Sequence, residues 1–356
     1  MISTVHPAFS AQAFIADALN GYEALDLVAR GRHIAETLHR HLPNDYSRAT
    51  EILLASLGPK LERTENFGMA PFLYLPHVIY VATYGIEHFE ISMHAQYELT
   101  QRFSAEFSIR RFLERYPEAT LARLRLWTTD SSPHVRRLVS EGTRPRLPWA
   151  PRLRAFQADP RPVLDLLERL KDDPVLYVRR SVANNLNDIG KDHPDLLVQT
   201  ARRWLVDAST ERRWLVQHAL RSALRRAEKP ALDVLGISGK KVSIREARIS
   251  PKRARVGESV SITFQVANTD AKAQHVRIDC RIFFVKANGS TSPKVFTLKD
   301  TTLGPRESVT VRKKISLAQL TTRKHYPGTH RVDVVVNGHT RPLGSFELAN
   351  PGKARR

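Results

Sequence analysis

The chain has 356 residues, a formal net charge of +20 and one cysteine, Cys280. This length predicts two or three domains with a substantial core. The single cysteine excludes an intramolecular disulfide, and the lack of any run of about 18 apolar residues excludes a transmembrane helix. Residues 1–12 lack the basic start and apolar core of a signal peptide, so we expect a cytoplasmic protein.

The positive charge is concentrated in the second and third parts of the chain. Residues 1–100 carry 6 basic and 11 acidic side chains, a net of −5. Residues 101–230 carry 26 and 16, a net of +10, and residues 231–356 carry 24 and 9, a net of +15. This distribution favours a polyanionic partner. A membrane surface is less favoured, because no Lys-rich amphipathic helix with an aromatic face occurs.

The first hundred residues predict helices. Ile34, Leu38 and Leu42 belong to an apolar series with helical spacing within residues 1–66. Residues 67–99 are richer in aromatic side chains, which favours a packed cap on one end of a helical array.

The spacing of apolar residues over 102–117 predicts the next helix. Phe103 and Leu113 lie on its apolar face, and Glu106 points close to that face because it precedes Leu113 by two turns. Arg110 is expected to pair with Glu106 across one turn.

Two related segments follow, and each carries the run Val-Arg-Arg. The copies stand at 135–137 and 178–180, and a looser third copy lies at 209–217. Helical units that recur at this interval are typical of HEAT-type repeats.

The repeats place polar residues at matched positions beside apolar helix stripes. Glu141, Asn184 and Gln217 each lie five residues after the first Arg of their copy. In the second copy, one polar line at helical spacing consists of Ser181, Asn184, Asn185 and Asp188. Polar groups on a core-facing helix are costly unless they are paired or face a groove.

The connection over 142–151 is rich in proline and arginine. Proline holds such a connection extended, and arginine suits phosphate contacts. Trp149 is interpreted as a core residue, with base stacking as the alternative.

From residue 241 the apolar period changes from about 3.6 to 2. Seven candidate strands with turn signals between them predict an immunoglobulin-like β-sandwich over 240–348, without the disulfide of antibody domains. The helical domain is expected to span 1–228, with an exposed linker over 229–239. The predicted fold is therefore a HEAT-like α-solenoid followed by a β-sandwich.

Three runs carry a resemblance to a known family. Ser140–Ala150, Tyr177–Asp188 and Lys191–Pro194 resemble the AlkC branch of the DNA alkylation repair glycosylases. The similarity covers residues 1–230 and extends weakly to the β-sandwich. It implies excision of alkylated bases from double-stranded DNA in the bacterial cytosol. The sister AlkD branch carries a Trp and an Asp four residues apart, a pair that this chain lacks.

The resemblance assigns catalytic roles to two carboxylates. Glu106 and Glu141 match active-site positions of AlkC-type enzymes, and Asp188 is a third candidate. The implied substrates are DNA bases methylated at N3, 3-methyladenine and 3-methylcytosine, captured without flipping the base into a pocket. Carboxylates suit this chemistry, since they stabilise a positively charged sugar and orient water.

We expect a monomeric, monofunctional glycosylase without cofactor, metal, membrane or obligate protein partner. The 14 histidines have no cysteine partners that would form a zinc site. Candidate DNA contacts are Arg110, Arg136, Arg137, Arg144, Arg146, Trp149, Arg152, Arg179, Arg180, Asn184 and Asn185.

Two alternatives stay open at this point. A HEAT scaffold that binds nucleic acid without catalysis has the same fold. A carbohydrate glycosidase also uses paired carboxylates, although the positive charge and the lack of aromatic sugar platforms argue against it. Acidic residues facing a basic groove favour the DNA glycosylase, because a pure DNA binder would lose affinity through them.

Overall fold

The computed structural model describes residues 1–65, 68–226, 228–237, 241–319 and 324–349. The chain forms two compact units, Met1–Ala219 and Leu220–Arg356, and the division falls within one helix. The first unit is helical. The second contains the end of that helix, one short helix and the β-strands.

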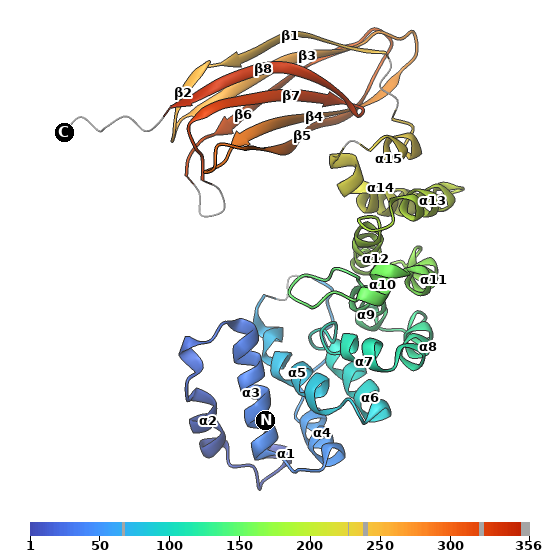
Figure 1. Ribbon diagram of the computed structural model, residues 1–356. Helices are drawn as coiled ribbons and strands as arrows, with labels where there is room; N and C mark the ends of the chain where they lie inside the picture. Colours follow the sequence, from blue (N-terminus) through green and yellow to red (C-terminus); the bar gives the residue numbers. More distant parts are fainter. Residues whose placement is uncertain (66–67, 227, 238–240, 320–323, 350–356) are drawn as a thin grey trace, which may run out of the picture. The chain divides into compact units, whose positions relative to one another are not determined.

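Helices of the first unit follow one another from blue to yellow-green in Figure 1. Their bounds are α1 (Ile2–Val5), α2 (Ala11–Leu19), η1 (Tyr22–Ala24), α3 (Leu27–His41), α4 (Tyr46–Ala55), η2 (Ala70–Tyr74), α5 (Leu75–Tyr84), α6 (Phe89–Thr100), α7 (Ile109–Arg115), α8 (Pro117–Trp127), α9 (Pro133–Gly142), α10 (Arg154–Ala158), α11 (Arg161–Leu170), α12 (Leu176–Ile189), α13 (Pro194–Leu205) and α14 (Thr210–Arg225).

Helix starts follow local chemistry. The side chains of Ser10, Asp26 and Asp45 each accept a hydrogen bond from the backbone N–H three residues later, so they cap α2, α3 and α4. Helix α9 begins with Pro133, which tolerates this position because the first helical residue needs no N–H partner within the helix.

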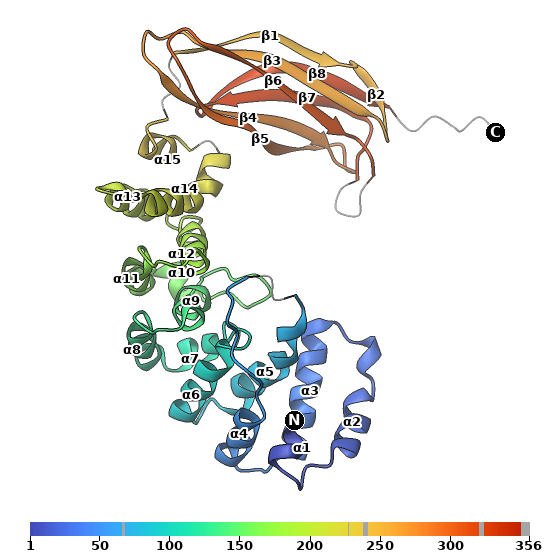
Figure 2. The same ribbon diagram turned by 180° about the vertical axis from the view of Figure 1, so that it is seen from behind.

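The repeats bury one face of each helix. In α11, Val163, Leu166, Leu167 and Leu170 are buried at the spacing of a single helical stripe. Helices α8, α9, α11 and α12 pack on one another (Figures 1 and 2). The HEAT-like solenoid predicted from the Val-Arg-Arg repeats is thereby confirmed.

The helix predicted over 102–117 is shorter than expected, because α7 begins only at Ile109. Glu106 lies in the loop before it. The Ser104 hydroxyl accepts a hydrogen bond from the Glu106 backbone N–H at 3.4 Å and donates to its carboxylate at 2.7 Å. Such local side-chain bonds compete with helix formation.

The linker expected over 229–239 contains a helix, α15 (Lys229–Val234), so that prediction was wrong for its first half. Ala231 and Leu232 are buried, which explains why the segment is ordered by packing. Residues 238–240 lie outside the described residues.

The β-strands of the second unit form two sheets, which confirms the predicted immunoglobulin-like sandwich. One sheet has the order β1-β3-β6 and the other β2-β8-β7-β4-β5. Apolar side chains that alternate along the strands fill the core between them. The strand bounds are β1 (Val242–Ser250), β2 (Arg253–Arg255), β3 (Ser259–Asn268), β4 (Gln274–Val285), β5 (Thr291–Leu303), β6 (Ser308–Ser316), β7 (Gly328–Val336) and β8 (His339–Ala349).

Candidate active site

A cavity of about 290 Å³ lies in the helical unit, where the loop before α7 meets α9 and α12. Two carboxylates and one guanidinium line it, among side chains that are mostly aromatic or apolar. The charged members are Glu106, Arg137 and Glu141, and the aromatic members are Phe72, Phe103, Phe107, Trp149 and Tyr177.

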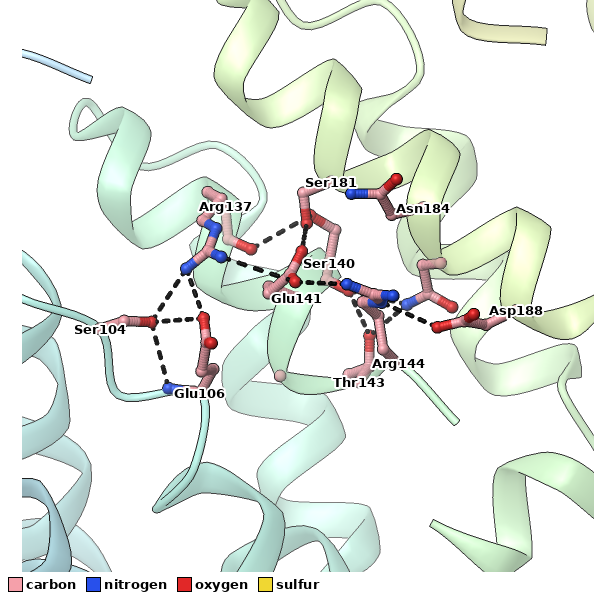
Figure 3. A network of polar contacts seen from close by, with 12 residues as sticks. Ser104, Glu106, Arg137, Ser140, Glu141, Thr143, Arg144, Ser181, Asn184 and Asp188 are labelled. Atoms are coloured by element: carbon pink, nitrogen blue, oxygen red, sulfur yellow. Dashed lines mark hydrogen bonds and ion pairs between the residues drawn. The ribbon is translucent and has the colours of Figure 1, made fainter. Parts of the chain in front are cut away.

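Arg137 of α9 joins the two carboxylates. Its Nη1 donates to Glu106 Oε2 at 2.5 Å, and its Nη2 lies 3.6 Å from Glu141 Oε1 (Figure 3). Burial alone would lower the pKa of Arg137, but Glu106 and Glu141 raise it. Arg137 therefore carries its charge at every physiological pH, and it holds the two acids of different segments around one cavity.

Glu106 keeps one oxygen open. Its Oε2 accepts hydrogen bonds from Ser104 at 2.7 Å and from Arg137. Its Oε1 has no hydrogen bond to any residue in the described part of the chain. The predicted pairing of Glu106 with Arg110 was wrong, because Glu106 precedes the helix and the Arg110 side chain points elsewhere.

Both oxygens of Glu141 are occupied. Arg144 donates to Oε1 at 2.6 Å, and the Ser181 hydroxyl of α12 donates to Oε2 at 2.6 Å. Burial alone would raise the pKa of Glu141, but Arg137, Arg144 and the Ser181 hydrogen bond hold it below its ordinary value. The side chain is therefore a fixed negative charge.

Gly142 allows the end of α9 to approach α7 closely. A Cβ atom at position 142 would lie 2.5 Å from Ile109 Cγ2, so any other residue there would require the Ile109 side chain or one of the two helices to shift. This contact ties the end of α9 to the segment that carries Glu106.

Asp188 lies behind Glu141 and does not line the cavity. It is 1% exposed, and it accepts hydrogen bonds from Arg144 Nε at 2.8 Å and from Lys191 Nζ at 2.8 Å. Its carboxylate thus fixes Arg144, which in turn fixes Glu141 (Figure 3). A direct catalytic role for Asp188 does not fit this position.

The two adjacent asparagines, Asn184 and Asn185, lie in different environments. Asn185 is fully buried, and its amide donates to Ser140 O at 2.7 Å and to Thr143 Oγ1 at 3.0 Å. It therefore joins α12 to the end of α9 and is not available to DNA. Asn184 is partly exposed and contacts His218 of α14.

Comparisons with known proteins cover nearly the whole chain. A family model described as the C-terminal Ig-like domain of the uncharacterised protein YhaZ matches residues 243–350. The uncharacterised protein YhaZ of Bacillus subtilis (strain 168) is 36% identical over 349 residues, which span 98% of this chain and 94% of that protein.

A solved structure adds the deciding observation. Pseudomonas fluorescens alkylpurine DNA glycosylase AlkC, bound to DNA containing an abasic site analog, is 38% identical. The match has a TM-score of 0.89 and covers 98% of this chain and 95% of that one. The chain belongs to the AlkC family. The resemblance inferred from the repeat residues is confirmed.

Most arginines predicted as DNA contacts serve the AlkC-family fold instead. Arg110 is 4% exposed, and its guanidinium donates to the backbone carbonyls of Gly142, Arg144 and Pro151. Burial lowers its pKa to about 10, so it stays charged and holds the proline-rich connection against α7.

Three further arginines of the predicted set donate hydrogen bonds to an aspartate carboxylate or to a backbone carbonyl. Arg136 binds Asp173 through two hydrogen bonds, and Arg146 binds Asp192 in the same way. Arg179 is buried and donates to Asp173 O. Arg137 and Arg144 hold the site carboxylates. Only Arg152 and Arg180 of the predicted set are exposed and have no ion pair with a described residue.

Trp149 is 77% exposed, so its interpretation as a core residue was wrong. It has a φ of 63°, a conformation that non-glycine residues adopt rarely, at a turn of the proline-rich connection. This backbone turns the indole out at the edge of the cavity, where it lines the wall.

Ser104 and Ser181 were not predicted as site residues, although both touch a site carboxylate. The sequence offered a signal only for Ser181, which continues the polar line of α12. Ser104 lies outside any periodic pattern. No group of three or more His, Cys, Asp or Glu side chains in the described ranges is placed to hold a metal ion. Among the same residues, no helix is long and apolar enough to cross a membrane.

Proposed function

We propose that this protein is a monomeric, monofunctional DNA glycosylase that removes positively charged N3-alkylated bases, 3-methyladenine and 3-methylcytosine, in base excision repair. The observation that carries the proposal is the pair of carboxylates, Glu106 and Glu141, around one guanidinium at a single cavity. The 38% identity to a DNA-bound alkylpurine DNA glycosylase over nearly the full length supports it.

The chemistry needs negative charge near the sugar. The bond between C1′ of the deoxyribose and the base nitrogen breaks, and its electron pair leaves with the base, which thereby becomes neutral. The sugar becomes an oxocarbenium-like cation. A water oxygen then bonds to C1′ and loses one proton, which gives an abasic site.

The two carboxylates suit different parts of this reaction. Glu141 is fixed by Arg144 and Ser181, so we assign it the stabilisation of the sugar cation. Glu106 has an open Oε1, which suits the orientation of water and acceptance of its proton. Asp188 acts through Arg144 and is a positioning residue.

DNA contacts are assigned to exposed side chains. Arg152 and Arg180 are exposed cations, and Trp149 presents an indole at the cavity. An exposed aromatic side chain beside a DNA site can stack on a base or sugar.

The sandwich offers a second basic surface, which we also assign to DNA. Arg248, Thr263 and Arg312 are register partners across the outer face of the β1-β3-β6 sheet. Arg245 and Lys314 flank that row, and all four cations are exposed. None of the four makes an ion pair with a described residue, which leaves them available to phosphate.

The alternative, a DNA-binding scaffold without catalysis, is less well supported. Acidic groups fixed at a cavity would repel phosphate and weaken a pure binder. Their fixation by buried hydrogen bonds also costs desolvation, which DNA binding alone does not require.

The test is incubation of the purified protein with methylated duplex DNA, followed by analysis of the released bases. We expect free 3-methyladenine and 3-methylcytosine, with abasic sites in otherwise intact strands. Binding of the DNA with no released base would favour the scaffold. Strand cleavage would contradict the monofunctional assignment.

A further inference from the structure

The Tyr177 ring of α12 lines the cavity of the candidate active site and contacts two residues of α9. The guanidinium carbon of Arg137 lies over its face, 5.2 Å from the ring centroid. The His134 ring meets it in an edge-to-face arrangement, with centroids 5.7 Å apart. Because His134 precedes Arg137 by three residues, both side chains lie on one face of α9. The Tyr177 ring therefore packs against the face of α9 that carries Arg137.

Tyr177 and Ser181 form a pair one turn apart on α12, and Arg137 and Glu141 form such a pair on α9. The Ser181 hydroxyl donates to Glu141 Oε2 at 2.6 Å, and the Tyr177 ring lies against Arg137. Each side chain of the α12 pair thus contacts one charged group of the site, the carboxylate or the cation. This matching indicates that α12 positions both charged groups.

Hydrogen bonds hold the edge of the Arg137 guanidinium. Its Nη1 donates to Glu106 Oε2 at 2.5 Å and to Ser104 Oγ at 2.9 Å, and its Nη2 lies 3.6 Å from Glu141 Oε1. The N–H groups of a guanidinium lie in its plane, so these contacts do not restrain its faces. An aromatic ring attracts a cation over its face, and the attraction is stronger where water is excluded. The Arg137 side chain is only 17% exposed, so the Tyr177 ring supplies an attraction that the hydrogen bonds do not.

We propose that Tyr177 is a positioning residue, whose ring face holds the Arg137 guanidinium against Glu106 and Glu141 and thereby keeps both carboxylates in place at the cavity. The need arises because the proposed reaction brings DNA phosphates close to this cation. Phosphate competes with carboxylate for a guanidinium, since both accept its paired N–H groups. The ring favours the inward position of Arg137. The proposal rests on the proposed glycosylase function, but it also makes a prediction that needs no DNA.

Tyr177→Leu removes the ring and keeps an apolar side chain. We expect single-turnover base release to fall by about tenfold, in line with the loss of a desolvated cation–π contact. Tyr177→Phe keeps the ring face without the hydroxyl group, so it should retain most of the rate. DNA affinity should hold or rise in both variants, because no cation is removed. Tyr177→Met, which keeps more of the side-chain volume, takes the place of Tyr177→Leu if that variant fails to fold.

Tyr116→Leu is the matched control. The Arg115 guanidinium carbon lies 4.9 Å from the centroid of the Tyr116 ring, and neither residue lines the cavity of the candidate active site. The variant removes a similar contact from the same helical unit, so base release should follow wild type. An equal loss in Tyr116→Leu and Tyr177→Leu would mean that lost stability, and not the position of Arg137, slows the reaction.

The measurement without DNA is the NMR signal of the Arg137 Nε–H group in protein with isotope-labelled arginine, assigned by its absence in Arg137→Lys or Arg137→Gln. An aromatic ring shifts the signals of protons that lie over its face. The Arg137 signal should therefore have a similar position in wild type and Tyr177→Phe and a different one in Tyr177→Leu. Tyr116→Leu should leave it where wild type has it.

Three results would overturn the proposal: an Arg137 signal that does not change in Tyr177→Leu, near-normal base release by folded Tyr177→Leu, or equal losses of base release in Tyr177→Phe and Tyr177→Leu. The last result would assign the effect to the hydroxyl group. A wild-type protein that binds DNA and releases no base would contradict the proposed function, and the Arg137 signal would still decide whether the ring positions the cation.

Discussion

The repeats around α9 and α12 and the β1-β3-β6 sheet are both rich in cations, but they use them in opposite ways. In the repeats, Arg137 and Arg144 are turned inward to hold carboxylates. On the sheet, Arg248 and Arg312 are exposed in one row with Thr263 between them. The net positive charge of a sequence therefore does not tell how many of its cations are free to bind DNA. Inward cations hold the site carboxylates, whereas outward cations are left for the proposed contact with DNA phosphate.

The largest effect is expected from removing the carboxylates that the inward cations hold. Glu106→Gln and Glu141→Gln keep the side-chain shape but remove the carboxylates. We expect each to slow base release by on the order of a hundredfold or more, about 2.7 kcal/mol of barrier. DNA affinity should hold or rise, since a negative charge has left the cavity.

Single-turnover base release, DNA affinity and melting temperature are measured on both variants. Glu118→Gln, at an exposed glutamate of α8, is the matched control and should behave as wild type. Near-normal base release by either folded site variant would remove that residue from the reaction.

The outward cations are tested by a paired substitution, Arg248→Gln with Arg312→Gln. If both contact phosphate, the slope of log affinity against log salt should fall by about two, and affinity at 0.1 M salt should fall on the order of 50-fold. The rate of base release from bound DNA should not change.

Lys299→Gln with Arg341→Gln removes two exposed cations from the other sheet and serves as the control. An equal loss in both double variants would mean that net charge, and not this face, governs affinity.

Ser181→Ala tests whether the hydrogen bond from Ser181 is needed to position the Glu141 carboxylate. The substitution removes the hydrogen bond to Oε2 and leaves Arg144 in place. We expect base release to fall by about tenfold, in line with the loss of a hydrogen bond to a charged group. Ser140→Ala is the matched control. Ser140 contacts Ser181 but not Glu141, so its effect should be smaller. Equal effects would contradict a specific role for Ser181.

The sequence predicted the fold well because the apolar period is a local property. Helical spacing, proline at the start of α9 and the change to a period of two after residue 241 each act within a few residues. Glu106 and Glu141 could be singled out by resemblance, and the structure places both at one cavity.

The partners of the charged residues could not be predicted, because they depend on contacts distant in sequence. Arg110 was expected to pair one turn away, yet it binds carbonyls 32 to 41 residues later. Trp149 was expected in the core, as most tryptophans are. Its exposure depends on a backbone conformation with positive φ, which the sequence does not reveal. Ser104 acts through its own loop, which no periodicity marks.

The smallest effect concerns the pH dependence of stability that comes from two buried acids, Glu141 of α9 and Asp279 of β4 in the second sheet of the sandwich. Glu141 has a lowered pKa, because Arg137, Arg144 and Ser181 outweigh burial. Its stabilising contribution is therefore present above the ordinary value of 4.5 and is lost as the pH falls through its folded pKa. Asp279 of β4 has a raised pKa, because burial outweighs Arg277. Its contribution is present below the ordinary value of 3.8 and is lost as the pH rises through its folded pKa.

Two variants should therefore change the pH dependence of the melting temperature of the full-length protein, one on the acidic side and the other toward neutral pH. Glu141→Gln should remove part of the loss of stability on acidification, and Asp279→Asn should remove part of the loss on going from acid to neutral pH. Scanning calorimetry from about pH 3.5 to 7 measures both, with Glu118→Gln as the exposed control whose profile should follow wild type. The sandwich acid has one weak arginine partner at 3.2 Å, whereas the site acid has donors on both oxygens. If both variants changed the profile of melting temperature against pH in the same way, the different hydrogen bonding of Glu141 and Asp279 would not determine their charge states.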